Sequence, residues 1–118
     1  MVRDPRAYLW DAQQAAEAIR QFTQGLDAVS YAGNALVRSA VERQFEIIGE
    51  ALNRLSKVDA ELARRVPHLA EIVSFRNVLI HGYGRIDHRR VWDIAEDRLP
   101  ALHKTVSALL IELGPPDA

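Results

Sequence analysis

The stretch Ser74-Phe75-Arg76-Asn77-Val78-Leu79-Ile80-His81-Gly82-Tyr83 decides how the chain is organised, because it places an arginine inside an apolar helix face. On a helix that turns about 100° per residue, one broad apolar arc holds Leu69, Ile72, Val73, Phe75, Leu79 and Ile80. Arg76 falls near the middle of this arc, and Tyr83 lies almost directly beneath it. The opposite side carries Ser74, Asn77 and His81. A guanidinium keeps its proton and needs an anion or water. Two explanations stay open: an internal carboxylate neutralises Arg76, or this face lines a cleft or subunit seam where an anion binds.

The length and composition predict one globular domain. The chain has 118 residues, of which 48% are hydrophobic and 26% are charged, and this length suits one core. Cysteine is absent, which excludes disulfides and cysteine-based metal sites. The longest apolar runs are far shorter than the ~20 residues of a membrane span, and no leader pattern opens the chain. We therefore expect a cytoplasmic protein with no membrane association.

The net charge of −1 argues against a general nucleic-acid binder that works by bulk attraction. The charge is unevenly distributed, however. The window between Ser74 and Trp92 has one carboxylate, Asp87, and four arginines: Arg76, Arg85, Arg89 and Arg90. Positive charge in the first turn of a helix works against the helix dipole, which favours an anionic partner. A GC-rich coding bias explains the excess of arginine over lysine equally well.

The hydrophobic spacing predicts an all-α antiparallel bundle of four main helices plus one short helix. The first helix is expected from the Asp4-Pro5 cap to Gly25, and the second from Asn34 to about Lys57. A short piece over 60–65 follows, then a helix from Pro67 to Gly82, and a last helix from Asp87 to Gly114 that Pro100 kinks. We expect residues 1–113 to form a single domain and 114–118 a disordered tail.

His81 and Arg76 are the candidate catalytic residues. Histidine titrates near neutral pH, and arginine stabilises a phosphate or developing negative charge. They are five residues apart, about 140° around an ideal helix, so one straight helix does not bring them together. A second copy of the segment across a two-fold axis can. Strand cleavage by a ribose 2′-OH needs one base and one acid, which two symmetry-related histidines can supply. This chemistry requires no metal and no cofactor.

Ordinary structural roles fit the same residues. A histidine at a helix end can be a capping or solvent-facing residue, and an arginine on an apolar stripe can be salt-bridged or extended along the core edge. Tyr83 can be a tyrosine at the core edge. We expect His68, His88 and His103 to be surface or capping residues. We expect Glu42, Glu46 and Glu50 to form a solvated face of the second helix.

Three blocks in order resemble one known family. The spacing Arg76, four residues, His81, one residue, Tyr83 resembles the R-x4-H-x-Y signature of HepT-like proteins in the HEPN superfamily. The segment 43–51 is similar to the family's long second helix. The segments 86–94 and 99–100 resemble the part that follows the motif. R-x4-H alone is a weak pattern, whereas the ordered set is much more specific.

The resemblance implies an all-α HEPN homodimer with a composite cleft at its two-fold axis. It implies a metal-independent endoribonuclease that acts on RNA, with tRNA and mRNA both open, as the toxin of a toxin–antitoxin pair. The implied partner is an MntA-like minimal nucleotidyltransferase antitoxin, which transfers AMP to the motif tyrosine. By position, Arg76 and His81 are the catalytic pair, Asn77 can orient the imidazole, and Tyr83 is the AMPylation site.

Two other hypotheses stay open. In the first, the protein is a non-catalytic HEPN nucleotide- or protein-binding subunit that partners a minimal nucleotidyltransferase. In the second, it is a plain helical dimer in which Arg76 pairs with an internal acid. RNA cleavage by the purified protein distinguishes the ribonuclease from both.

Overall fold

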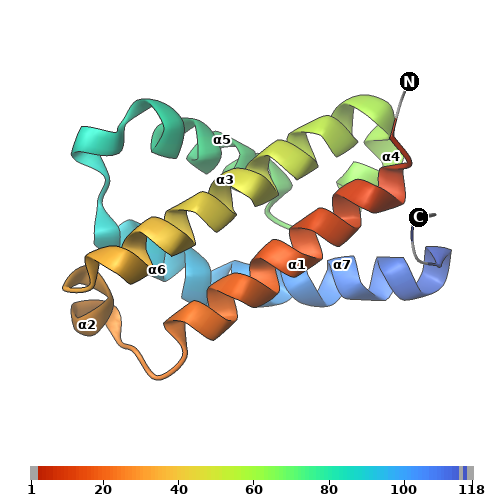
Figure 1. The fold of residues 1–118 in the computed structure, drawn as a ribbon. Helices are drawn as coiled ribbons and strands as arrows, with labels where there is room; N and C mark the ends of the chain where they lie inside the picture. The colour runs from red at the N-terminus through yellow and green to blue at the C-terminus, as the bar shows by residue number, and fades with distance from the viewer. Residues whose placement is uncertain (1–2, 115, 117–118) are drawn as a thin grey trace.

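A computed structural model describes residues 3–114 and 116. Within these residues, no segment is a strand, and the chain forms seven α-helices and one short 3-10 helix (Figure 1). In chain order these are α1 (Pro5–Thr23), α2 (Ala28–Ala32), α3 (Ala35–Val58), α4 (Ala60–Arg64), α5 (Leu69–His81), η1 (Tyr83–Arg85), α6 (His88–Asp97) and α7 (Leu99–Leu113). The all-α prediction is therefore confirmed.

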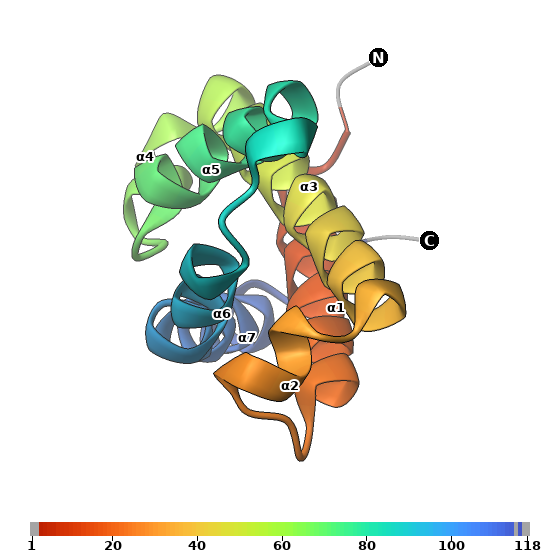
Figure 2. The same ribbon diagram turned by 90° about the vertical axis from the view of Figure 1, so that its left-hand side faces the viewer.

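The long helix α3 is central to the packing. It contacts α1 along one side and α5 along the other, and α7 packs against α1. Figure 1 shows α1 and α3 running in opposite directions, and Figure 2 shows α5 beside α3 with α6 and α7 below them. This arrangement places the end of α5 at an outer edge of the molecule, from which the segment 82–87 leads to α6.

Short polar residues fix where several helices begin. The side chains of Asp4, Asn34, Asp59 and Asp87 each accept hydrogen bonds from backbone N–H groups of α1, α3, α4 and α6 respectively. Such caps satisfy N–H groups that have no partner within the helix, and each is worth about 1 kcal/mol. The caps predicted at Asp4, Asp59 and Asp87 are confirmed.

Aromatic pairs in the core fix α5 and α6 to the rest of the molecule. The rings of Phe45 on α3 and Phe75 on α5 meet edge to face, with centroids 5.4 Å apart. The rings of Tyr31 on α2 and Trp92 on α6 lie 5.5 Å apart. The side chains of Tyr31, Phe45 and Phe75 are almost fully buried. The pair on α3 and α5 therefore holds the motif helix in register one residue away from Arg76.

The prediction of one last helix over 87–114 is wrong in one respect, because the structure has two helices there. Helix α6 ends at Asp97, and α7 begins at Leu99, with Arg98 at the junction. Pro100 lies in the first turn of α7, where a missing backbone N–H costs no helix hydrogen bond. The proline therefore starts a new helix instead of kinking a continuous one.

The motif helix also differs from its prediction at both ends. It begins at Leu69 instead of Pro67, after His68 adopts a left-handed conformation with φ of 61°. Ile80, which we placed on the apolar arc, is 38% exposed. The buried face of α5 is thus narrower than predicted and consists of Ile72, Phe75 and Leu79.

At the C-terminus, α7 ends at Leu113, and Gly114 follows with φ of 83°. The remainder of the predicted tail, apart from Pro116, lies outside the described residues. Among the described helices, none is both long and apolar enough to cross a membrane.

Candidate active site

Helix α5 approaches α3 most closely where Arg76 crosses Gly49. A Cβ atom on Gly49 would lie 2.3 Å from Cβ of Arg76 and 2.7 Å from its Cγ, far below a normal contact. Only glycine therefore allows the stem of Arg76 to lie directly on the α3 backbone. The close approach determines where the guanidinium can reach.

The guanidinium of Arg76 is held by side chains from two helices. Its Nη2 donates to Oε2 of Glu50 on α3 at 2.5 Å, and its Nη1 donates to Oδ1 of Asn77 at 3.0 Å. The Arg76 side chain is 24% exposed. Its Nε is buried and, among the described residues, has no hydrogen-bond partner. The internal carboxylate that the sequence left as one explanation for Arg76 is thus Glu50.

Glu50 is shared between two arginines. Its Oε1 accepts from Nε of Arg54 at 2.5 Å, while its Oε2 accepts from Arg76. The hydrogen bond from Arg54 is the main reason that the pKa of Glu50 lies below its usual range. Partial burial opposes this shift, and the charges of Arg76 and Lys57 add to it. Glu50 is 37% exposed, as expected of a solvated face, but two arginines engage its carboxylate.

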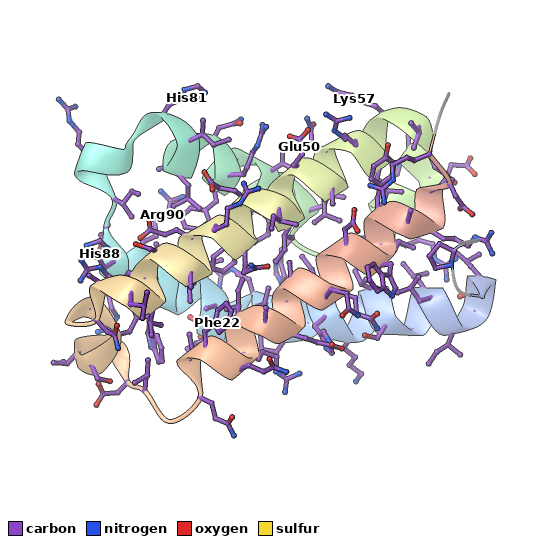
Figure 3. The ribbon with its side chains drawn as sticks, in the orientation of Figure 1. Phe22, Glu50, Lys57, His81, His88 and Arg90 are labelled. Atoms are coloured by element: carbon purple, nitrogen blue, oxygen red, sulfur yellow. The ribbon has the colours of Figure 1, made fainter. Side chains whose placement is uncertain are left out.

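Asn77 and His81 lie on the exposed side of α5. His81 is the last residue of the helix, and Figure 3 shows it at the outer edge of α5, away from α6 and α7. The Asn77 oxygen accepts from Arg76, and the role of Asn77 in orienting the imidazole stays a prediction. Within one chain, Arg76 points toward α3 and His81 toward solvent, as the helix geometry predicts.

The loop after α5 is fixed at Gly82. Its N–H donates to the carbonyl of Val78 at 2.7 Å, and a Cβ atom there would lie 2.8 Å from the same oxygen. The backbone of Tyr83 then opens η1. The side chain of Tyr83 lies outside what the structure describes, so its role stays a prediction.

Two of the basic residues after the motif, Arg89 and Arg90, have local partners. Arg89 pairs with Asp93 at 2.9 Å, one turn along α6. The guanidinium of Arg90 lies over the ring of Phe75, 5.6 Å from its centroid. Asp87 accepts from the N–H groups of both Arg89 and Arg90, which offsets the unfavourable positive charge in the first turn.

A partly buried polar group that we did not predict lies where α2, α3 and α6 meet. The hydroxyl of Tyr31 and Nδ1 of His88 are both buried and lack hydrogen-bond partners among the described residues. Burial raises the pKa of Glu42, while the nearby His88 lowers it. Burial and the charge of Glu42 raise the pKa of Tyr31. His88 is therefore not a simple surface residue, and Glu42 does not belong to a solvated face.

His103 also differs from expectation, because its Nε2 lies 3.1 Å from Oε1 of Glu17 and its side chain is only 17% exposed. Among the described residues, no group of three or more His, Asp or Glu side chains could hold a metal ion. Helical spacing gave no signal for the contact between His103 and Glu17 or for the closeness of His88 to Glu42, because each joins helices that are distant in sequence.

Comparison of the sequence with known proteins identifies one family. The family model described as "Ribonuclease HepT-like" matches residues 12–109. The chain belongs to the HepT-like ribonuclease family. This HepT-like chain is 36% identical over 104 residues to a Methanocaldococcus jannaschii protein named provisionally as an RNase, covering 88% of this chain and 94% of that protein. It is 31% identical over 109 residues to a Caldanaerobacter subterraneus protein with the same provisional name, covering 92% and 96% respectively.

A third relative bears the family's own name. A Thermococcus cleftensis protein named provisionally as ribonuclease HepT is 31% identical over 102 residues, which cover 86% of this chain and 92% of that protein. No solved structure gives a significant match. The family resemblance that the Arg76, His81 and Tyr83 motif indicated is thereby confirmed.

Proposed function

We propose that this HepT-like protein is a metal-independent endoribonuclease and the toxin of a HepT/MntA-type toxin–antitoxin system. The observation that supports it best is the placement of the motif at an accessible edge of a family ribonuclease. His81 and Asn77 are exposed, and Arg76, which points toward α3 from the same helix, keeps a quarter of its side chain exposed.

The proposed reaction is attack of a ribose 2′-OH on the adjacent phosphorus. One His81 acts as the base and takes the 2′-OH proton as the new P–O2′ bond forms. The His81 of a second copy acts as the acid and protonates O5′ as the P–O5′ bond breaks. The products are a 2′,3′-cyclic phosphate and a 5′-OH end. Arg76 stabilises the extra negative charge on the pentacoordinate phosphorus.

This mechanism requires a homodimer, because one His81 cannot be acid and base at once. Exposed apolar side chains beside the motif support such a pairing. Val78 is 40% exposed and Ile80 is 38% exposed, and both lie on α5 within three residues of His81. A second copy is the partner that would cover them. Sedimentation of the purified protein at micromolar concentration tests this, and a monomer would contradict the shared cleft.

The proposed substrate is RNA, and the proposed partner is an MntA-like nucleotidyltransferase that transfers AMP to Tyr83. Gly82 and Gly84 flank this tyrosine in the sequence, so its two chain neighbours have no side chains. Co-expression with the antitoxin should add mass in multiples of one adenylyl group, and Tyr83→Phe should abolish the gain. An unchanged gain in that variant would exclude Tyr83 as the acceptor.

The cleavage test uses the purified protein, total RNA and a chelator. Wild type should cleave, and His81→Asn should reduce the rate by about 100-fold or more, as for loss of an acid–base group. The matched control is His68→Asn at the other end of α5, because asparagine also tolerates the left-handed conformation of residue 68. Equal cleavage by wild type and His81→Asn would show that the assigned site is wrong.

The ion pair between Arg76 and Glu50 is the specific observation that favours the alternative of a plain helical dimer, in which Arg76 pairs with an internal acid. In that alternative, Arg76 has a structural role, and Arg76→Ala changes stability without changing any RNA cleavage. Loss of cleavage in a folded Arg76→Ala variant would exclude it.

A further inference from the structure

We infer that Glu50 is a positioning residue that holds Arg76 in its phosphate-binding orientation, and that Arg54 keeps the group positively charged. This inference rests on the proposed ribonuclease function and extends its site from α5 to α3. The contacts that carry it are the two hydrogen bonds on the Glu50 carboxylate, one from Arg54 and one from Arg76.

The first argument is geometric. The stem of Arg76 lies on Gly49, where even a methyl group would collide. The next residue of α3, Glu50, takes Nη2, and Asn77 takes Nη1. Both ends of the side chain are thus held by neighbours, and the guanidinium loses little further freedom when a ligand binds. Such preorganisation is what a phosphate-stabilising group needs.

The second argument concerns hydrogen-bond capacity. A guanidinium has five N–H bonds, two on each terminal nitrogen. Glu50 and Asn77 each use one terminal N–H of Arg76, so a second N–H remains on Nη1 and on Nη2. Two such donors suit a phosphate, which arginine often binds through two parallel bonds. The Glu50 contact therefore orients Arg76 without consuming the donors that the substrate requires.

The third argument concerns charge. A carboxylate paired with one arginine forms a neutral group that attracts phosphate weakly. Here Glu50 divides its oxygens between Arg54 and Arg76, so the three side chains together carry a net charge of about +1 at neutral pH. Arg54 also holds the pKa of Glu50 below its usual range. Glu50 thus remains an acceptor throughout the range in which an unperturbed histidine titrates.

The experiment compares Glu50→Ala, Glu50→Gln and Arg54→Ala with the control Glu46→Ala, one turn earlier on α3, where the glutamate pairs only loosely with Arg43 at 3.6 Å. Cleavage of a defined RNA is measured with the chelator, after folding is checked by circular dichroism. Glu50→Ala should lower kcat by about 100-fold, the usual cost of a catalytic group displaced by about 1 Å. Glu50→Gln keeps an oxygen acceptor for Nη2 and should retain more activity than the alanine variant.

Arg54→Ala should raise KM and leave kcat nearly unchanged, because it removes positive charge without moving Arg76. Glu46→Ala should match wild type. The inference is overturned by a folded Glu50→Ala variant that cleaves RNA as fast as Glu46→Ala while Arg76→Ala is inactive. It is equally overturned if Glu50→Gln is no more active than Glu50→Ala.

A second measurement separates this inference from the proposed function. The Nε–H of Arg76 is buried, so its NMR signal in the wild-type protein should exchange slowly with solvent, without any RNA present. Glu50→Ala should broaden or remove this signal, and Glu46→Ala should not. If wild type leaves RNA intact, the ribonuclease proposal fails, whereas an unchanged Arg76 signal in Glu50→Ala refutes the positioning role itself.

Discussion

Gly49→Ala is the substitution that tests the α3–α5 contact most directly. The added Cβ would lie 2.3 Å from Cβ of Arg76, whereas ordinary contacts begin at 3.4 Å. The two helices must therefore separate locally by about 1 Å. Rotation of the arginine does not relieve this clash, because its Cβ is bonded to the α5 backbone.

Two opposing effects set the stability change. Alanine has a higher helix propensity than glycine, which favours the variant by about 1 kcal/mol. Overpacking of a close contact costs about 1–3 kcal/mol, and the upper end applies because the clashing atom cannot move aside. The expected net loss is about 2 kcal/mol, and Tm should fall by about 8 °C at about 4 °C per kcal/mol for a domain of this size.

Activity should fall further than stability. Displacing Arg76 by about 1 Å from its position beside Glu50 should reduce RNA cleavage by up to about 100-fold at a temperature where the variant is fully folded. The matched control is Gly33→Ala, because a Cβ there meets only ordinary contacts at 3.6 Å and beyond. A Gly49→Ala protein as stable and as active as wild type would refute the close-packing argument.

Two further substitutions test other parts of the structure. Glu42→Gln should raise Tm at pH 7–8, because burial raises the pKa of Glu42 and the folded state therefore favours its neutral form. The gain in Tm should disappear below the unfolded pKa of about 4.3, where the wild-type carboxyl is protonated too. A gain that persists at pH 3 would contradict this cause. Gly82→Ala should lower the rate of RNA cleavage more than Gly84→Ala does. Of these two positions, only residue 82 has a Cβ that would collide with the backbone, at 2.8 Å from the carbonyl oxygen of Val78. Equal activity of the two variants would show that this turn does not position the motif.

Most of the helices could be predicted from the sequence because their determinants are local. The apolar stripe of α3 repeats at helical spacing over 24 residues, and the caps at Asp4, Asp59 and Asp87 depend on residues only two or three positions away. The short helix α2 lies within the connection between the first two long helices. Asp27 caps its start and Gly33 caps its end, which limits it to a short turn of helix.

The partner of Arg76 could not be predicted because it depends on how two helices pack. Glu50 lies 26 residues before Arg76, and its spacing with Glu42 and Glu46 is typical of a solvated helix face. One local signal was available. Gly49 occurs in the middle of a long helix, where glycine is unfavourable and usually has a packing reason. That glycine marks the point where α5 crosses α3.

The same limit applies to the break at Arg98 and to the buried nitrogen of His88. Helical spacing from Val91 to Leu113 is continuous enough to suggest one helix. Pro100 suits the first turn of a new helix, and the two helices pack separately, α6 against α2 and α7 against α1. Nδ1 of His88 is buried because α6 begins close to α3, beside Glu42. Neither feature follows from spacing, since both depend on the direction in which a helix leaves its loop.

The two explanations for an arginine on an apolar face are compatible once the carboxylate has two partners. A pair formed by Glu50 and Arg76 alone would be neutral, and a phosphate would have to displace the carboxylate to bind. Arg54 changes this balance, because it takes one oxygen of Glu50 and brings a second positive charge. The free charge then equals one guanidinium and lies where Arg76 is already held between Glu50 and Asn77. An anion that approaches this edge of α5 therefore meets a preorganised donor instead of a closed salt bridge.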